Sequence, residues 1–370
     1  MKFIVIKSNL KDGLSIVEKA SGENLNLPIL KNILIETINN RIKLTATNLE
    51  IAISYFTTGK VIENGRFTVP VGIFTNLINN IQSDRLNIEK KGGRLEVKTD
   101  NYEATIQGLP ADDFPLTPKI KDADQFVEIK TEILKEALEQ VLVATQFSDL
   151  RPELNSVLFD FSIETLKLVA TDSFRLAERI INSSQFNTNH KQGFKILIPL
   201  KTTHELSRVL RDGEVMKIYH DDNQILFKTE QSEFLSRLVD GSFPEYSAII
   251  PKKFSVETIL NRQEFINALR LTSVFGSKSG EVKIRSHDNK KVVEIISRDQ
   301  SIGENNYILS AKIQGKLKET VFNWRYIADA LKALKTEDVF FGINEETEPA
   351  AIKPSPEGLY IYILKPIVSA

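Results

Sequence analysis

The chain has 370 residues, more than one ordinary hydrophobic core accommodates, which indicates two or three domains. Hydrophobic residues make up 41% and charged residues 26%, the balance of a folded chain rather than a disordered one. With 48 basic and 49 acidic residues the net charge is −1, so any affinity for nucleic acid must come from local separation of charge.

Several function classes are excluded by what the sequence lacks. It has no cysteine, so there is no disulfide, thiol nucleophile or cysteine-bound metal. Its four histidines form no metal-binding pair at helical spacing, and it contains no phosphate loop, dinucleotide-binding or nucleophile-elbow motif. There is neither a signal peptide at the start nor an apolar run long enough to span a membrane. We therefore expect a soluble cytoplasmic protein that is not an enzyme and uses no metal or cofactor.

The first third of the chain is predicted to contain short strands and two amphipathic helices. Residues 10–17 carry apolar side chains at helical spacing, and residues 42–47 have the pattern of a strand. Residues 67–70 (FTVP) end another strand and open a second helix. A further strand is followed by residues 113–115 (DFP).

The same order returns about 125 residues later, which is the length of a whole domain rather than of a solenoid repeat. Residues 134–141 match residues 10–17, and residues 166–171 (LKLVAT) match residues 42–47 (IKLTAT). Residues 197–199 open the second helix of this copy, as residues 67–70 do in the first. Residues 242–244 (SFP) match residues 113–115 (DFP).

A third, weaker copy follows, with a helix around 265–269, a strand at 292–299, a helix opening at 321–324 and a last strand at 359–364. Short polar breaks at 116–124 and 251–253 separate the copies. We predict three similar domains, 1–121, 122–250 and 251–370. Each is expected to have an α+β fold of antiparallel sheets with two helices.

Positive charge collects on corresponding helices. After Pro199, basic side chains recur every three or four residues at Lys201, His204, Arg208 and Arg211. The helix after Asn323 repeats this design with Arg325, Lys332 and Lys335, although Asp329 interrupts the face. One such face alone is ordinary solvated surface. Two on equivalent helices of a nearly neutral chain indicate a surface for the backbone of duplex DNA, bound without reading its sequence.

Six stretches, in order and at family spacing, resemble the bacterial sliding clamp, the β subunit of the replicative DNA polymerase. They are 27–36 (LPILKNILIE), 45–50 (TATNLE), 109–115 (LPADDFP), 144–147 (ATQF), 170–177 (ATDSFRLA) and 243–246 (FPEY). The resemblance covers the whole chain.

The resemblance implies a ring-forming, head-to-tail homodimer of three-domain chains with the DNA-clamp fold. Such a ring encircles double-stranded DNA, slides without sequence specificity and acts as a non-catalytic processivity factor. It implies a cytoplasmic, nucleoid-associated protein. The implied partners are a clamp loader, the replicative DNA polymerase and other proteins with clamp-binding motifs.

The family also has a hydrophobic pocket for partner peptides between its second and third domains. Carried over by position, this pocket would be formed by Leu154, Thr171, Ser173, Phe174, Arg175, Leu176, Pro244, Ala248, Ile249, Pro349, Ile363 and Lys365. Two positions depart from the common family pattern. Ser173-Phe174 replaces a small residue followed by His or Tyr, and Lys365 replaces an apolar residue. Without the resemblance, Leu154, Leu176 and Ile249 would equally suit an ordinary core.

Two more surfaces follow from the resemblance. The DNA-facing side chains would be Arg151, Lys201, Arg208, Arg211, Arg270, Lys332 and Lys335. The dimer interface would join Phe74, Ile78 and Leu109 of one copy to Val274 and Phe275 of the other. Those five apolar residues could instead fill the cores of their own domains.

Two alternatives stay open from the sequence. A β-rich scaffold that binds only proteins is disfavoured by the basic helix faces, and monomeric behaviour without DNA association would favour it. A hydrolase is disfavoured because the chain lacks a nucleophile arrangement, a metal-ligand set and a phosphate loop.

Overall fold

The computed structural model describes residues 1–22, 26–38, 40–121, 124–147, 151–275, 280–286, 291–299, 301–345, 347–356 and 358–368. By internal contacts the chain divides into two compact units. Unit 1 consists of Met1–Glu132, Asn187–His190 and Arg208–Leu238, and unit 2 consists of Ile133–Phe186, Lys191–Ser207 and Val239–Ala370. None of the helices in the described residues is long and apolar enough to cross a membrane.

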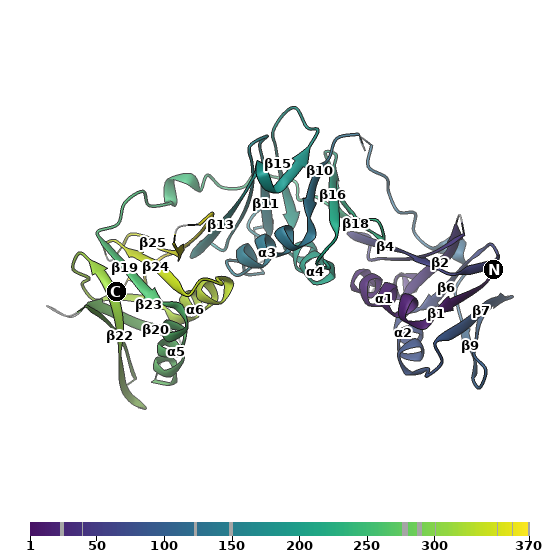
Figure 1. The fold of residues 1–370 in the computed structure, drawn as a ribbon, viewed down its shortest axis with the longest axis horizontal. Coiled ribbons are helices and arrows are strands. Elements are labelled where there is room, and N and C mark those ends of the chain that lie inside the picture. The colour runs from purple at the N-terminus through teal and green to yellow at the C-terminus, as the bar shows by residue number, and fades with distance from the viewer. Residues whose placement is uncertain are drawn as a thin grey trace. The chain divides into compact units, whose positions relative to one another are not determined.

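Three successive sets of elements, repeat 1 to repeat 3, follow one another along the chain (Figure 1). Repeat 1 comprises β1 (Lys2–Ile6), α1 (Lys7–Val17), η1 (Glu18–Ala20), η2 (Pro28–Lys31), β2 (Asn32–Ile38), β3 (Arg41–Thr47), β4 (Ile51–Thr58), β5 (Lys60–Glu63), β6 (Arg66–Pro70), α2 (Val71–Asn80), β7 (Arg85–Lys91), β8 (Arg94–Lys98), β9 (Glu103–Gln107) and η3 (Ala111–Asp113).

Repeat 2 has the same alternation of strands and two α-helices. It comprises β10 (Val127–Lys130), α3 (Thr131–Leu142), β11 (Ser156–Phe161), β12 (Thr165–Thr171), β13 (Arg175–Asn182), η4 (Ser183–Gln185), β14 (Phe186–Thr188), β15 (Phe194–Pro199), α4 (Leu200–Val209), β16 (Val215–His220), β17 (Gln224–Lys228) and β18 (Ser232–Arg237). The short helix η5 (Ser247–Ile249) lies in the segment that follows.

Repeat 3 differs in one respect, because one long strand takes the place of two. It comprises β19 (Val256–Asn261), α5 (Arg262–Thr272), η6 (Ser273–Phe275), β20 (Glu281–Ser286), β21 (Val292–Asp299), β22 (Gly303–Gln314), β23 (Thr320–Asn323), α6 (Trp324–Ala333), β24 (Asp338–Ile343), β25 (Ala350–Ser355) and β26 (Tyr360–Leu364).

Strand order shows that the repeats share one topology. Four strands run β6-β2-β3-β4 in repeat 1, β15-β11-β12-β13 in repeat 2 and β23-β20-β21-β22 in repeat 3. The other strands run β5-β1-β7-β8-β9, β14-β10-β16-β17-β18 and β22-β19-β24-β25-β26. The matching segments 42–47 and 166–171 are the equivalent strands β3 and β12, with residues 292–299 as β21. The predicted threefold α+β repeat is confirmed.

Neighbouring repeats are joined by backbone pairing between strands. In unit 1, β18 pairs antiparallel with β4, with Leu235 opposite Ala52. In unit 2, β26 pairs antiparallel with β13, with Ile363 opposite Leu176. These joints, which we call joint 1–2 and joint 2–3, turn separate sheets into sheets of nine and twelve strands.

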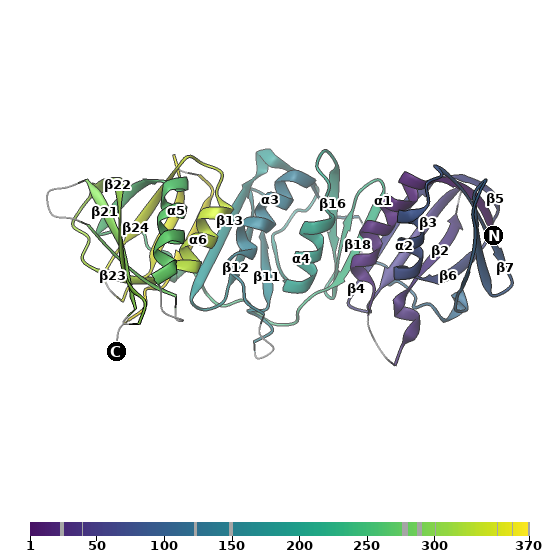
Figure 2. The same ribbon diagram turned by 90° about the horizontal axis from the view of Figure 1, so that it is seen from below.

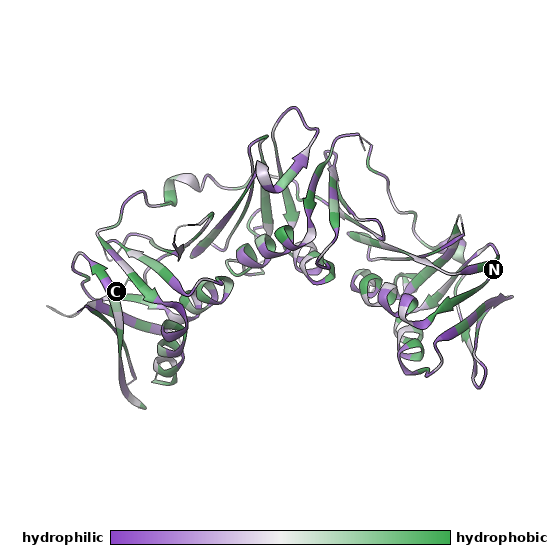
Figure 3. Ribbon diagram, in the orientation of Figure 1, coloured by the Kyte–Doolittle hydropathy of each residue, from purple (hydrophilic) through white to green (hydrophobic). Residues whose placement is uncertain are grey.

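The helices cover the sheets in pairs. Helices α1 and α2 pack together, as do α5 and α6, and Figure 2 shows α3 and α4 near each other in the same way. Each helix carries both hydrophilic and hydrophobic residues along its length (Figure 3). On α6, for example, Ile327 and Leu331 are fully buried while Lys332 is exposed. Asn261 and Asn323 cap the N-termini of α5 and α6, and their side-chain oxygens accept backbone N–H groups of the first turn.

Candidate partner-binding and DNA-facing surfaces

A hydrophobic cluster lies at joint 2–3, where the peptide pocket is predicted. Leu176 on β13 and Ile363 on β26 face each other across the joint and are almost fully buried. The cluster consists of Leu158, Val169, Leu176, Leu197, Ala351 and Ile363. The structure therefore brings two of the predicted pocket residues together as part of a core.

The segment after β18 packs over this cluster. Its partly buried side chains Phe243, Tyr246 and Ile250 contact the cluster. The Tyr246 hydroxyl donates a 2.7 Å hydrogen bond to Oε2 of the buried Glu178. Burial raises the pKa of Tyr246, and its hydrogen bond to Glu178 raises it further, so the phenol stays protonated and holds the segment in place. The sequence reasoning missed this contact, because the two residues lie 68 positions apart.

The predicted pocket residues Pro244, Ala248 and Ile249 are exposed along the same segment. Ile249 leaves 41% of its surface in water. Leu154 is buried, Pro349 is half-buried and Lys365 is exposed. The predicted set thus combines buried apolar side chains with exposed apolar and polar ones.

The turn between β12 and β13 presents the one aromatic side chain of the predicted pocket set, Phe174. Ser173 has φ of +78°, in the left-handed region that glycine adopts without strain. Thr171 and Asp172 hold the turn, because their side-chain oxygens accept backbone N–H groups and the Thr171 hydroxyl donates to the Arg175 carbonyl at 2.7 Å. Phe174 is consequently 59% exposed, and its carbonyl accepts the N–H of Lys365 at 2.9 Å.

Arg175 turns inward from this turn. Its Nε donates to Asp172 at 2.9 Å, and one terminal nitrogen donates to Asp329 of α6 at 2.8 Å. The other terminal nitrogen donates to the Thr145 carbonyl at 3.2 Å, and the guanidinium lies 4.3 Å from the centre of the Tyr326 ring. Burial lowers the pKa of Arg175, but the charges and hydrogen bonds around it more than offset this and raise the pKa above its ordinary value. Arg175 thus ties β13 to α6.

This arrangement also accounts for the acidic residue on the basic face of α6. Asp329 accepts a hydrogen bond from the Arg175 guanidinium, so the negative charge of Asp329 is compensated from within the chain. The sequence offered no signal for this pairing, since the two residues lie 154 positions apart.

Besides Lys335, five of the predicted DNA-facing residues are exposed on or near helices. They are Arg151, Lys201, Arg208, Arg270 and Lys332. Lys335 is exposed, but its ammonium pairs with Glu136 at 2.8 Å. Arg211 is half-buried, lies 3.6 Å from Asp12 and stacks over the Tyr55 ring. Lys335 and Arg211 are therefore shared with carboxylates of the same chain.

The predicted interface residues fall into two groups. Phe74 and Ile78 are fully buried inside repeat 1, so they present no side-chain surface to a second copy. Leu109 and Val274 leave 39% and 65% of their surface exposed, and Phe275 is half-buried.

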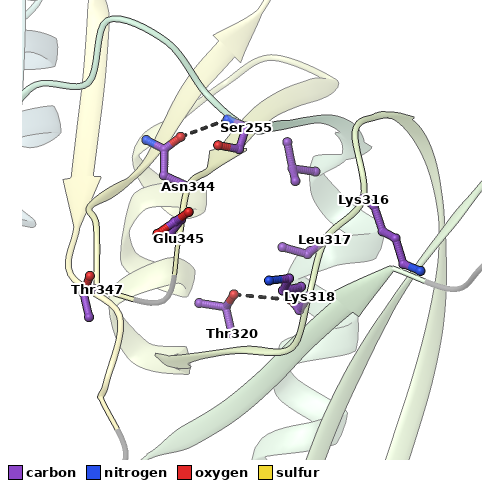
Figure 4. Close-up of a pocket in the computed structure, with 9 residues that line it drawn as sticks. Ser255, Lys316, Leu317, Lys318, Thr320, Asn344, Glu345 and Thr347 are labelled. Atoms are coloured by element: carbon purple, nitrogen blue, oxygen red, sulfur yellow. Dashed lines mark hydrogen bonds between the residues drawn. The ribbon is translucent and has the colours of Figure 1, made fainter.

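A polar hollow of about 480 Å³ lies in repeat 3 (Figure 4). It is lined by Ser255, Val256, Lys316, Leu317, Lys318, Thr320, Asn344, Glu345 and Thr347. The Ser255 N–H donates to Asn344 at 2.9 Å at its edge. None of the predicted pocket residues lines it. Within the described parts of the chain, no cluster of three or more His, Asp or Glu side chains could hold a metal ion.

Comparison with known proteins identifies the family. Sequence models of the DNA polymerase III beta subunit match residues 1–118 (N-terminal domain), 128–245 (central domain) and 247–367 (C-terminal domain). The chain belongs to this family. The beta sliding clamps of Bacillus subtilis and Synechococcus elongatus are 26% and 25% identical to it, over 99% of both chains in each case.

Solved structures agree with the sequence comparison. The DNA polymerase sliding clamp of Bacillus subtilis superposes with a TM-score of 0.93 at 26% identity. The DNA polymerase III beta subunit of Thermotoga maritima gives 0.91 at 26% identity, and both alignments cover 100% of each chain. The predicted clamp fold of three tandem domains and the predicted function as a sliding-clamp processivity factor in DNA replication are confirmed. The exact domain boundaries and the site residues stay predictions.

Proposed function

We propose that two copies of this chain close head to tail into a ring around duplex DNA. The ring slides without reading sequence, carries out no chemistry and works in the cytoplasm in association with the nucleoid. A clamp loader places it on DNA. It then tethers the replicative polymerase and other proteins with clamp-binding motifs.

The observation that carries the proposal is a pair of unpaired strand edges. Joints 1–2 and 2–3 pair the fourth strand of one repeat with the last strand of the next. The equivalent strands left over are β22 in repeat 3 and β9 in repeat 1. Strand β9 ends its sheet, and residues 303–310 of β22 pair on one side with β21 in the described structure.

An open strand edge is a template for pairing with another chain. If β22 of one copy pairs with β9 of the next as β4 pairs with β18, the contact is heterologous, and two such contacts close a two-chain ring. Leu109, two residues beyond β9, and Val274, beside β22 in repeat 3, supply exposed apolar surface for this seam.

Topological linkage gives the test. The chain is loaded with its clamp loader onto nicked circular duplex and passed over a sizing column at moderate salt. We expect the protein to elute with the circle and to be lost after a restriction cut linearises it, since a sliding ring leaves through an open end. Equal retention on circular and linear DNA would mean that the protein binds along the duplex and does not encircle it.

The partner site that we propose is the surface over the joint 2–3 cluster. It is supported by an apolar floor at Leu176 and Ile363 and by exposed apolar side chains at Phe174 and Ile249. This combination suits an extended peptide with hydrophobic anchors.

A further inference from the structure

An apolar hollow lies at joint 1–2, wholly within unit 1. It has a volume of about 320 Å³. It is lined by Lys43, Ala52, Ser54, Thr117, Pro118, Lys119, Ile120, Leu226, Glu233 and Leu235. Its floor is the sheet formed by β3, β4, β17 and β18, and the segment after η3 forms its wall.

The floor of this hollow corresponds by strand register to the cluster at joint 2–3. At joint 2–3, Leu176 lies opposite Ile363, and Ile363 lies opposite Ala351. At joint 1–2, Ala52 lies opposite Leu235, and Leu235 lies opposite Leu226. Each set of three sits on the equivalent strands of adjoining repeats, so the two floors are the same structural position.

The wall corresponds as well. Aligning residues 113–115 with residues 242–244 places Ile120 at the position of Ile249 and Thr117 at that of Tyr246. In both places the segment that leaves one repeat crosses the joint formed with the next. At joint 2–3 its side chains contact the floor, and at joint 1–2 they line the hollow above it. The differences lie in the side chains, since Ala52 replaces Leu176 and leaves more room above the strands.

The charge at the rim specifies the ligand. Lys43 and Lys119 both line the hollow, and Lys119 is exposed. The one carboxylate of the lining, Glu233, pairs with Lys228 at 2.8 Å, which compensates its charge. An apolar floor bordered by two cations fits a leucine-sized anchor with carboxylates beside it.

We propose that joint 1–2 is a second peptide-docking site, which takes an extended acidic peptide with aliphatic anchors. This inference rests on the proposed function of joint 2–3 as a peptide site. It gives each chain two docking positions of related geometry and different preference. One partner could then hold the clamp at both joints, or two partners could occupy one chain.

The test uses the 370-residue chain and a synthetic hexapeptide of two leucines flanked by aspartates, carrying a benzophenone and a fluorophore. After irradiation, digestion and mass spectrometry locate the crosslinks. We expect crosslinks in residues 117–120 and on β17 or β18, in addition to any near Ile249. The double variant Lys43→Glu/Lys119→Glu should lower the yield at joint 1–2 about five-fold or more and leave joint 2–3 unchanged.

Two controls make the result specific. The variant Lys31→Glu, an exposed lysine outside the lining, should have no effect, and a peptide with lysines in place of the aspartates should not label joint 1–2. Labelling at Ile249 alone would overturn this inference and leave the proposed function standing. Labelling at joint 1–2 alone would support it and count against the joint 2–3 pocket. Labelling at neither joint would overturn both peptide sites, whereas the ring is tested separately by retention on circular DNA.

Discussion

Arg175 has an internal role although the resemblance places it in the partner pocket. Three of its contacts are polar, with Asp172, Asp329 and the Thr145 carbonyl, and its side chain is 10% exposed. A guanidinium makes these contacts simultaneously because its donors are held in one plane. Its distant partner on α6 could not have been found from sequence, since nothing in local spacing links positions so far apart.

The first prediction concerns this residue. Arg175→Met leaves the buried carboxylate of Asp172 and the partly buried Asp329 without their cation, so we expect the free energy of unfolding to fall by about 3 kcal/mol. Arg175→Lys should recover only part of the loss, because an ammonium cannot reproduce the planar set of contacts. Urea unfolding followed by circular dichroism measures both variants. Lys167→Met on β12 is the control, and a loss for Arg175→Met no larger than for the control would contradict the assigned role.

The second prediction separates peptide binding from stability at joint 2–3. Leu176→Ala removes a core side chain and should cost about 2–5 kcal/mol, so a binding defect in that variant would be ambiguous. Phe174 and Ile249 are exposed, so Phe174→Ala/Ile249→Ala should leave the unfolding curve within about 0.5 kcal/mol of the parent. We expect this double variant to lose at least ten-fold in affinity for a leucine- and phenylalanine-containing partner peptide in a calorimetric titration. Unchanged affinity would remove these two side chains from the proposed site.

The third prediction concerns two stacked histidines in unit 1. His190 and His220 lie with their ring centres 5.6 Å apart and nearly parallel. Burial lowers the pKa of both, and the neighbouring charge of His220 lowers that of His190 further. Near and below the unfolded value of about 6.5 the unfolded chain therefore binds more protons than the folded chain, and the free energy of unfolding decreases as the pH is lowered.

We accordingly expect the melting temperature to decline between pH 7 and pH 5, and the decline to be shallower in His190→Gln/His220→Gln. Differential scanning calorimetry at several pH values measures this. His204→Gln on α4 is the matched control. Parallel curves for the double variant and the parent would show that the pair does not contribute to the pH dependence.

At the scale of single elements, helix spacing was sufficient to predict which face of α4 and α6 is buried. Leu206 and Leu331 are fully buried, and Lys201 and Lys332 on the other faces are exposed. Periodicity identifies a face but not the neighbours of that face. Lys335 and Arg211 are matched by carboxylates from α3 and α1, which the sequence could not show.

The fourth prediction follows from that difference. Lys201→Glu/Lys332→Glu should weaken retention of the loaded clamp on circular duplex more than Lys335→Glu/Arg211→Glu does, because Lys335 and Arg211 are already shared with Glu136 and Asp12. Each lost phosphate contact should lower the slope of log affinity against log salt by about 1. A salt series on closed circles measures the slopes. Equal slopes in the parent and the Lys201/Lys332 variant would assign these side chains to ordinary solvated surface.

At the scale of the whole molecule, the sequence predicted three copies of one domain but not the way the copies share sheets. Matching segments are local patterns and identify equivalent strands such as β3 and β12. The pairing of β4 with β18 joins residues about 180 positions apart, and no periodic signal reports such a partner. The resemblance likewise located the peptide pocket. The hydrogen bond from Tyr246 to Glu178, which holds the segment beside it, is seen only in the structure.

The fifth prediction tests the seam between copies. The chain has a mass of 41.9 kDa, so light scattering behind a sizing column should give a species of about 84 kDa that persists on dilution. Leu109→Glu/Val274→Glu places like charges on the two proposed sides of the seam and should shift the mass toward the monomer. Ile62→Glu, an exposed apolar residue on β5, is the control. A parent that stays at 41.9 kDa at every loading concentration would contradict the closed ring and favour a monomeric scaffold.

Because β4 pairs with β18, the connecting segment between repeats 1 and 2 is not what holds these repeats together. Five registered residue pairs, from Ser232 opposite Tyr55 to Ser236 opposite Ile51, hold the two repeats together by their backbones. A protease that cut the exposed connection near Leu116 would therefore yield two fragments on a denaturing gel and one particle in solution. The intact backbone near Leu116 keeps the two repeats in one chain while it folds, and the β4–β18 strand pairing holds them together in the folded protein.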